Sequence, residues 1–169
     1  WSDLVYYLNR FGKSPKTLQS YSTFSVGGSL SVNAHGITSD VCVHESIISF
    51  DLIKWDGNLI TCKKEEDGES GELFNLVIGG YGMFGVITEV TMSVQPNARL
   101  MMDMIQCDRN EFYDVYKALI NNSKVCVKLG RIDVSNGTDF QLFIFSKDGA
   151  NDVGVVSDLP LAPREMSRT

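Results

Sequence analysis

The sequence predicts an α+β fold on the basis of two patterns. Residues 47–55 are apolar and β-branched with rough alternation, and Asp56-Gly57 separates them from a second apolar run at 59–62. A strand, an Asp-Gly turn and a second strand are typical of a β-hairpin. Beyond Asn97 the hydrophobic patterns follow the order strand, helix, strand, strand. This order is the beginning of an α+β layer.

The segment before the hairpin is predicted to contain a helix and a loop. Apolar side chains fall at helical spacing over residues 3–11, with Ser2 or Asp3 as the expected cap. Gly12 is expected to end this helix. Its apolar face comprises Leu4, Tyr7, Leu8 and Phe11. Residues 13–24 are rich in Ser and Thr and are predicted to form a loop.

A further helix and the best strand candidate follow the hairpin. Residues 72–78 are predicted to be helical and to end at Gly79-Gly80. Residues 85–94 are predicted to be a strand, because alternate residues form a mostly apolar face. That face comprises Val86, Val90, Met92 and Val94, with Thr88 in the same alternation.

We place a domain boundary at Gln95-Pro96-Asn97, where the pattern breaks. The predicted domains are therefore residues 1–96 and 97–169. The second is expected to contain strands at 100–107, 125–134 and 139–146 and a helix at 110–121 with Phe112, Val115, Tyr116 and Leu119 inward. Residues 150–169 show little periodicity, so this domain is expected to stop before its fold is complete.

The length, net charge and hydrophobicity of the chain argue against several classes of protein. The 169 residues are enough for one domain or two small lobes. A net charge of -6 argues against a nucleic-acid binder, which usually has a basic face. No apolar run is long enough to cross a bilayer, and the first residues do not resemble a signal peptide. Because residue 1 is Trp rather than Met, we expect the chain to begin inside a longer one.

The four cysteines do not form a recognisable metal or disulfide pattern. No two are spaced as C-x-x-C, and no His lies at ligand spacing from them, which argues against a zinc site. They are too sparse for a disulfide scaffold and are expected to be reduced and mostly buried. The four are Cys42, Cys62, Cys107 and Cys126. The compartment is left open, with the cytoplasm slightly favoured.

Two glycine-rich stretches carry most of the functional information. In the first, residues 25–36, Ser25 is expected to cap a short helix from Val26 to about Asn33. Its small residues and N-terminal amides would let the backbone approach a large flat group or a phosphate. The alternative is a Ser- and Gly-rich loop between two elements.

The second glycine-rich stretch, residues 79–85, has spacing close to that of a dinucleotide-binding fingerprint. That fingerprint should follow a strand and open a helix. Here the stretch follows a predicted helix and opens a predicted strand, so the match to the fingerprint is weak.

Several motifs in order resemble one enzyme family. They are Ser-Val-Gly-Gly at 25–28, Asn-Ala-His-Gly at 33–36, the Asp-Gly hairpin, Glu-Leu-Phe at 72–74 and Gly-Gly-x-Gly-x-x-Gly-Val-Ile-Thr at 79–88. The set resembles the FAD-linked oxidases of the vanillyl-alcohol-oxidase and p-cresol-methylhydroxylase type. Within that family it looks most like the sugar and aldonolactone oxidases and decaprenylphosphoryl-ribose oxidase. The resemblance covers roughly residues 14–96.

The resemblance implies a PCMH-type FAD-binding domain of two lobes, with the flavin between them. Residues 1–96 would be its C-terminal lobe, and residues 97–169 the incomplete beginning of an α+β substrate (cap) domain. The first lobe supplies a Gly-rich pyrophosphate loop and, in many members, a His covalently bonded to the flavin. Neither is found before residue 14. We therefore expect a fragment whose missing first FAD lobe is a required partner.

The resemblance also implies the residues that contact FAD. Gly27 and Gly28 would lie beside the isoalloxazine and pyrophosphate, where a Cβ would collide with the cofactor. The backbone of Ile87, with Val86 second, would hold the adenine side. The neighbouring contacts would be Ser20, Ser25 and Val26, and the stretch under the flavin ring would include Val32, Asn33 and His35.

His35 is the predicted catalytic residue. It would hydrogen-bond the flavin or a substrate hydroxyl and help to carry a proton or stabilise negative charge. Each of these assignments has a structural alternative. Gly27 and Gly28 could instead allow a tight entry into the helix, and His35 could instead contact backbone near Gly36. Val86 and Ile87 could be ordinary core residues of the strand. His44 has no match in the family and is expected at the surface or in packing.

The predicted function is part of a flavin-dependent oxidoreductase. It would oxidise an alcohol carbon of a sugar, lactone or polyol by hydride transfer to FAD, and the fragment alone is expected to be inactive. The expected ligands are FAD and a small sugar-like substrate, without nucleic acid. The alternative is a non-catalytic binding module or a remnant that needs a partner chain. The electron acceptor, the covalent state of the flavin and the oligomeric state are left open.

Overall fold

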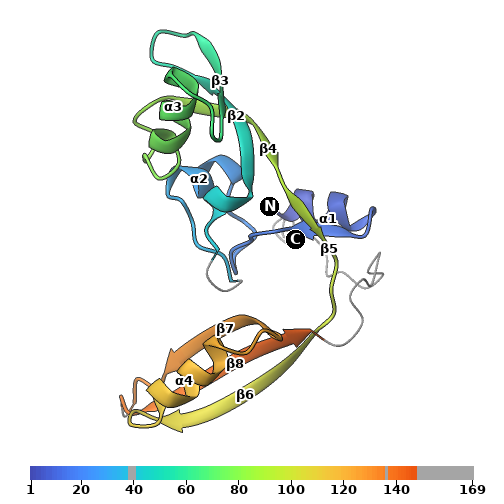
Figure 1. Cartoon of the computed structure of the whole chain (residues 1–169), viewed down its shortest axis with the longest axis vertical. Helices are drawn as coiled ribbons and strands as arrows, with labels where there is room; N and C mark the ends of the chain where they lie inside the picture. Colours follow the sequence, from blue (N-terminus) through green and yellow to red (C-terminus); the bar gives the residue numbers. More distant parts are fainter. Residues whose placement is uncertain (38–40, 136, 148–169) are drawn as a thin grey trace, which may run out of the picture.

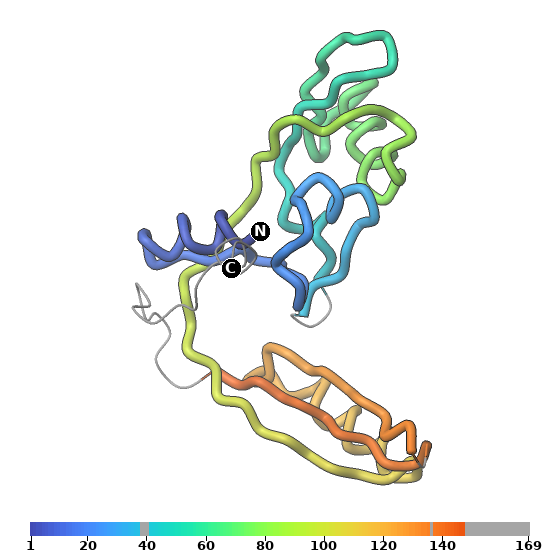
Figure 2. The backbone as a smooth tube through the Cα atoms, turned by 180° about the vertical axis from the view of Figure 1, so that it is seen from behind, coloured from blue at the N-terminus to red at the C-terminus, as the bar shows by residue number. Residues whose placement is uncertain are grey.

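The computed structural model describes residues 1–37, 41–135 and 137–147. These residues form two groups of elements, each built on an antiparallel sheet (Figures 1 and 2). A short antiparallel pair, β1 (Lys13–Pro15) and β5 (Val94–Pro96), lies between the groups. The predicted α+β class agrees with this mixture of helices and sheets, and the division into two domains at residue 96 stays a prediction.

The first sheet has three strands in the order β3-β2-β4. They are β2 (Ile47–Ile53), β3 (Leu59–Lys63) and β4 (Val86–Met92). The predicted hairpin at Asp56-Gly57 joins β2 to β3 and is confirmed. The helices of this group are α1 (Ser2–Asn9), α2 (Val26–Ser31), the 3-10 helix η1 (Val43–Ser46) and α3 (Glu69–Val77).

The core of the first group lies between its central strand and α3. Phe50 and Leu52 of β2 are buried, and Cys62 of β3 pairs with Phe50 on the same face. The Phe74 ring of α3 stacks on Phe50 with centroids 5.5 Å apart. Such a pair contributes about 1 kcal/mol beyond the area that it buries. The sheet and α3 therefore form two layers around one apolar core.

A β-bulge in β4 changes which residues face this core. Asp51 pairs with Glu89 while the next residue, Leu52, pairs with Ile87, so Thr88 is the extra residue. Ile87 and Val90 consequently both pack against the core. The prediction of a mostly apolar face is therefore wrong at Val86 and Val94, which are 65% and 42% exposed.

The start of α1 differs from the prediction. Trp1 is the N-cap, and its side chain makes no capping hydrogen bond. Neither Ser2 nor Asp3 takes the cap position, because both lie inside the helix. The Ser2 hydroxyl instead donates to the Ser22 carbonyl oxygen at 3.1 Å, which ties α1 to the loop before α2.

Two other expectations around α1 are also wrong. Leu4 packs against the core, but Tyr7 and Phe11 are 55% and 62% exposed and contact each other. Residues 13–15, expected in a loop, form β1 because a partner 80 residues later, β5, pairs with them. That partner also occupies the position where the sequence pattern breaks, at Gln95-Pro96.

The bounds of α2 and α3 differ slightly from the prediction. Ser25 caps α2 as expected, but the helix ends at Ser31 rather than near Asn33. The predicted helix at 72–78 begins three residues earlier, at Glu69. The Ser70 hydroxyl donates to the Thr61 carbonyl oxygen at 3.0 Å, and this tertiary contact fixes the first turn against β3.

The second sheet has the strand order β6-β8-β7 and is covered on one face by α4. Its elements are β6 (Leu100–Asp108), α4 (Phe112–Ile120), β7 (Val125–Ile132) and β8 (Asp139–Lys147). The predicted inward face of the helix is confirmed, since Phe112, Val115, Tyr116 and Leu119 all belong to this core. Residues 150–169 lie outside the described residues. None of the described helices has the length and hydrophobicity needed to cross a membrane.

The four cysteines are free thiols, as the sequence predicts, but only two are buried. Cys62 and Cys107 are buried, whereas Cys42 and Cys126 are half-buried. Burial raises the pKa of the Cys62 thiol from 9.0 to about 11, with a smaller contribution from the Asp51 carboxylate. The neutral thiol is therefore the form that the folded core accepts.

We expect the free energy of unfolding to fall as the Cys62 thiol ionises. Its folded-state pKa lies above its ordinary value, so its contribution is complete below about pH 9 and is lost as pH rises through about 11. The free energy of unfolding, measured with urea at about pH 9 and about pH 11, should fall more between these two pH values for the natural chain than for Cys62→Ala. Equal losses in the two proteins would contradict the assignment.

Candidate functional site

The N-terminal end of α2 is fixed by a chain of hydrogen bonds. The Ser25 hydroxyl accepts from the Gly28 amide at 3.1 Å, which completes the predicted cap. The Ser29 hydroxyl donates to the Ser25 carbonyl oxygen at 3.0 Å and accepts from the indole nitrogen of Trp1 at 2.8 Å. The start of the helix is therefore anchored both locally and to the first residue of the chain.

The C-terminal end of α2 is capped by the second glycine-rich stretch. The Gly79 amide donates to the Leu30 carbonyl oxygen at 2.9 Å, and the Tyr81 amide donates to the Ser31 carbonyl oxygen at 2.8 Å. Gly79 and Tyr81 both have positive φ, at 84° and 53°. The two glycine-rich stretches are thus in direct contact, which no local sequence pattern predicts.

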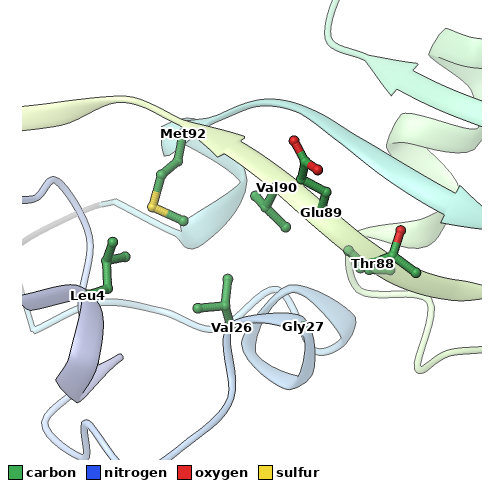
Figure 3. Close-up of a pocket in the computed structure, with 8 residues that line it drawn as sticks. Leu4, Val26, Gly27, Thr88, Glu89, Val90 and Met92 are labelled. Atoms are coloured by element: carbon green, nitrogen blue, oxygen red, sulfur yellow. The ribbon is translucent and has the colours of Figure 1, made fainter. Parts of the chain in front are cut away.

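A cavity of about 390 Å³, here called the first cavity, lies between α2 and β4 (Figure 3). Val26 of α2 and Val90 of β4 point toward each other across it, and Leu4 and Met92 face it at one end. The Glu89 carboxylate points to the opposite side of β4. The side chains that enter the first cavity are therefore mainly apolar.

Gly27 fits a site where a bulky group lies against the backbone. It lines the first cavity, and a Cβ built on it would meet no atom within 4 Å. The amides of the first helical turn, including those of Val26 and Gly27, have no acceptor inside the helix. Free amides, open space and apolar side chains together suit part of a flat cofactor that also carries polar oxygens.

Gly28 has a different environment from Gly27. A Cβ on Gly28 would lie 2.9 Å from the Ser25 hydroxyl oxygen, so a side chain there would displace the hydroxyl that caps the helix. This contact agrees with the structural alternative of a tight helix entry at Gly28, whose contact with a cofactor stays a prediction. At Gly27, in contrast, no neighbouring atom of the protein would be displaced by a Cβ.

The structure brings together only some of the predicted site residues. Val26, Gly27 and Ile87 line the first cavity. Seven predicted residues are not among those lining it, namely Ser20, Ser25, Gly28, Val32, Asn33, His35 and Val86. Their contact with a cofactor stays a prediction.

The stretch after α2 is organised by contacts within the protein. Asn33 has φ 44°, and its side-chain oxygen accepts from the His44 amide at 3.3 Å. His35 is exposed, and its ring nitrogen Nδ1 lies 3.2 Å from the Gly36 carbonyl oxygen. This contact resembles the structural alternative in which His35 contacts backbone near Gly36. The His44 ring packs edge-on against Phe74 at 5.6 Å, as the packing alternative expects. The catalytic role of His35 stays a prediction.

Sequence reasoning missed most of the β4 side of the first cavity. The additional lining residues are Leu4, Thr88, Glu89, Val90 and Met92. The alternation in residues 86–92 was a usable signal, but the bulge at Thr88 shifts it. Leu4 comes from α1, which contacts β1, and its place beside Met92 in the cavity lining is one that no local pattern indicates.

Comparison with known proteins identifies related sequences. A family model described as an FAD binding domain matches residues 1–63. Cytokinin dehydrogenase 1 of Arabidopsis thaliana is 28% identical over 145 residues, which cover 82% of this chain and 24% of that protein. Cytokinin dehydrogenase 2 of Oryza sativa subsp. japonica is 34% identical over 100 residues, which cover 57% of this chain and 17% of that protein.

These matches support the FAD-linked oxidases as the family and FAD as the cofactor. They do not support the sugar or aldonolactone oxidases in particular, because the relatives carry a different name. The chain spans about a quarter or less of the length of the curated relatives that it matches.

We expect Gly80→Ala to lower the free energy of unfolding by about 1–3 kcal/mol. A Cβ at Gly80 would overlap the Leu76 carbonyl oxygen and crowd the Phe84 ring, which displaces the loop that caps α2. Urea unfolding measures the change. The control is Gly130→Ala on β7, whose Cβ would make an ordinary 3.5 Å contact with Leu142. Equal stability of the two variants would contradict the expectation.

Proposed function

We propose that this chain, which is related to the FAD-linked oxidases, forms one wall of the FAD site in a flavin-dependent oxidoreductase. The single observation that carries the proposal is Gly27, at the start of α2, facing the first cavity with no atom in the place of its missing side chain. The sequence motif predicts that Gly27 contacts FAD, and the structure places the same residue in the lining of the first cavity.

The chain's own residues would hold the cofactor by three means. The free amides at the start of α2 would donate to its oxygen atoms. Val26 and Val90 would contact its flat apolar part from opposite sides. The backbone of Ile87 would support it from β4, with Val86 beside it. When bound, FAD supplies the reaction's two-electron chemistry by accepting a hydride.

The substrate class has two candidates. The sequence motifs favour an alcohol carbon of a sugar, lactone or polyol, whereas the matched relatives are named cytokinin dehydrogenases. We place a cytokinin first, because those matches extend over as much as 82% of the chain. A non-catalytic remnant of the FAD fold, which binds cofactor without oxidising either class, is the alternative that the substrate experiment distinguishes.

We expect Gly27→Val to reduce FAD retention at least about tenfold, equivalent to about 1.4 kcal/mol of binding free energy. The added methyl groups would enter the space assigned to the cofactor, while the fold should tolerate them because nothing lies within 4 Å of the Cβ. Bound flavin per protein, measured from the visible absorbance of the purified natural protein containing this chain, gives the readout.

Two variants make this result interpretable. Gly130→Val changes the same residue type on β7, away from the first cavity, and should retain FAD. Gly28→Val is a poorer test, because it disturbs the Ser25 cap as well. Full flavin retention by Gly27→Val would remove the basis of the proposed wall.

We expect a cytokinin, added without oxygen to the flavin-loaded natural protein, to bleach the visible flavin absorbance. A sugar or lactone tested in parallel should leave the absorbance unchanged. Bleaching by the sugar or lactone alone would reverse the order of the two substrate classes. No bleaching by either class would favour the non-catalytic alternative.

A further inference from the structure

A second cavity, of about 400 Å³, lies between the β1–β5 pair and the second sheet. One side is formed by Ser14, Gln95 and Pro96, and the other by Leu100, Val127 and Lys147. It shares no lining residue with the first cavity. Its volume is within the range of small-molecule sites.

The sheet side of the second cavity belongs to the face that α4 does not cover. Strand alternation puts Leu142 and Ile144, which pack in the α4 core, on one face of β8 and Lys147 on the other. Leu100 pairs directly with Lys147, and Val127 pairs with Phe145 on the same uncovered face. The uncovered face next to the cavity is therefore apolar apart from one cation.

The charge around the second cavity is unbalanced. Among the described residues that line it, the exposed Lys147 is the only charged one, and none of them is a carboxylate. Within the described residues Lys147 forms no ion pair. The carboxylates of the uncovered sheet face, Asp108 and Asp139, pair at the far end of β6 and β8. Eight residues of strand separate them from Lys147, roughly 26 Å.

The composition of the lining restricts the chemistry of the ligand. Pro96, Leu100 and Val127 offer apolar contact, and the Ser14 hydroxyl is a further hydrogen-bonding group. Transfer of a strongly hydrated inorganic anion into such a lining is costly, whereas an organic anion with an apolar body matches both parts of it. The ammonium group of lysine is a compact charge that pairs well with a carboxylate.

We propose that the second cavity binds a small carboxylate with a compact apolar body, its charge paired with Lys147. This site is separate from the proposed FAD wall and does not depend on it. The ligand's apolar body would lie against Leu100 and Val127. An apolar carboxylate is thus expected to bind, while an uncharged analogue of the same size is not expected to bind comparably.

Cys126 provides a direct reporter of occupancy. It lines the second cavity and is half-buried. Cys42 is also half-buried but lies opposite His35, in the first group of elements. Alkylation of both thiols by uncharged iodoacetamide can be followed for each cysteine separately by mass spectrometry. Cys42 is therefore an internal control within the same molecule.

The experiment measures how benzoate slows alkylation of the full chain. Benzoate should protect Cys126 in a saturable way and leave Cys42 unaffected, and benzyl alcohol should protect Cys126 much less. Lys147→Met, which removes the charge, should weaken benzoate protection up to about fivefold, while Lys147→Arg should retain it. Lys64→Met, in an exposed turn, should behave as the natural chain does.

Each alternative result bears on the proposal. Equal protection by benzyl alcohol, or unchanged benzoate protection in Lys147→Met, would overturn the role of the cation. Equal protection of Cys42 and Cys126, or no protection of either, would overturn the site itself. Comparing each variant with and without benzoate removes any effect of Lys147 on the intrinsic reactivity of Cys126.

Discussion

The hydrogen bonds from the 79–81 loop to the end of α2 are the constraint on which the candidate site depends. A six-residue helix is far too short to be stable alone. Here the Gly79 and Tyr81 amides satisfy the carbonyl oxygens of Leu30 and Ser31. Because these groups are about 50 residues apart in sequence, α2 acquires its position only when the loop after α3 is in place.

The same loop also sets the position of β4. It leaves the end of α3, caps α2 and then continues into the strand that pairs with β2. Once α2 and β4 are tied to one loop, Gly27 and Val90 come to face the same cavity. The bulge at Thr88 turns Ile87 toward the core and so combines a packing role with a place in the cavity lining.

The two cavities differ in the chemistry of their walls. The first combines helix-start amides with apolar side chains of α2 and β4, which suits a cofactor held largely through backbone. The second combines the apolar side chains of Leu100 and Val127 with the ammonium group of Lys147. The second sheet has its own core around α4, and the second cavity lies on the opposite face of this sheet.

Local sequence patterns determined most of the elements of this protein. The Asp-Gly turn, the Ser25 cap and the inward face of α4 act within a few residues, and each is present where the sequence predicts it. The motifs at 25–36 and 79–88 also implied FAD through their resemblance to the FAD-linked oxidases, and their glycines allow the backbone to come close to another group. Only the tertiary structure decided which glycine faces a cavity and which serves a cap. It also decided that β1 pairs with β5 and that the second glycine-rich stretch caps α2, since these contacts join residues far apart in sequence.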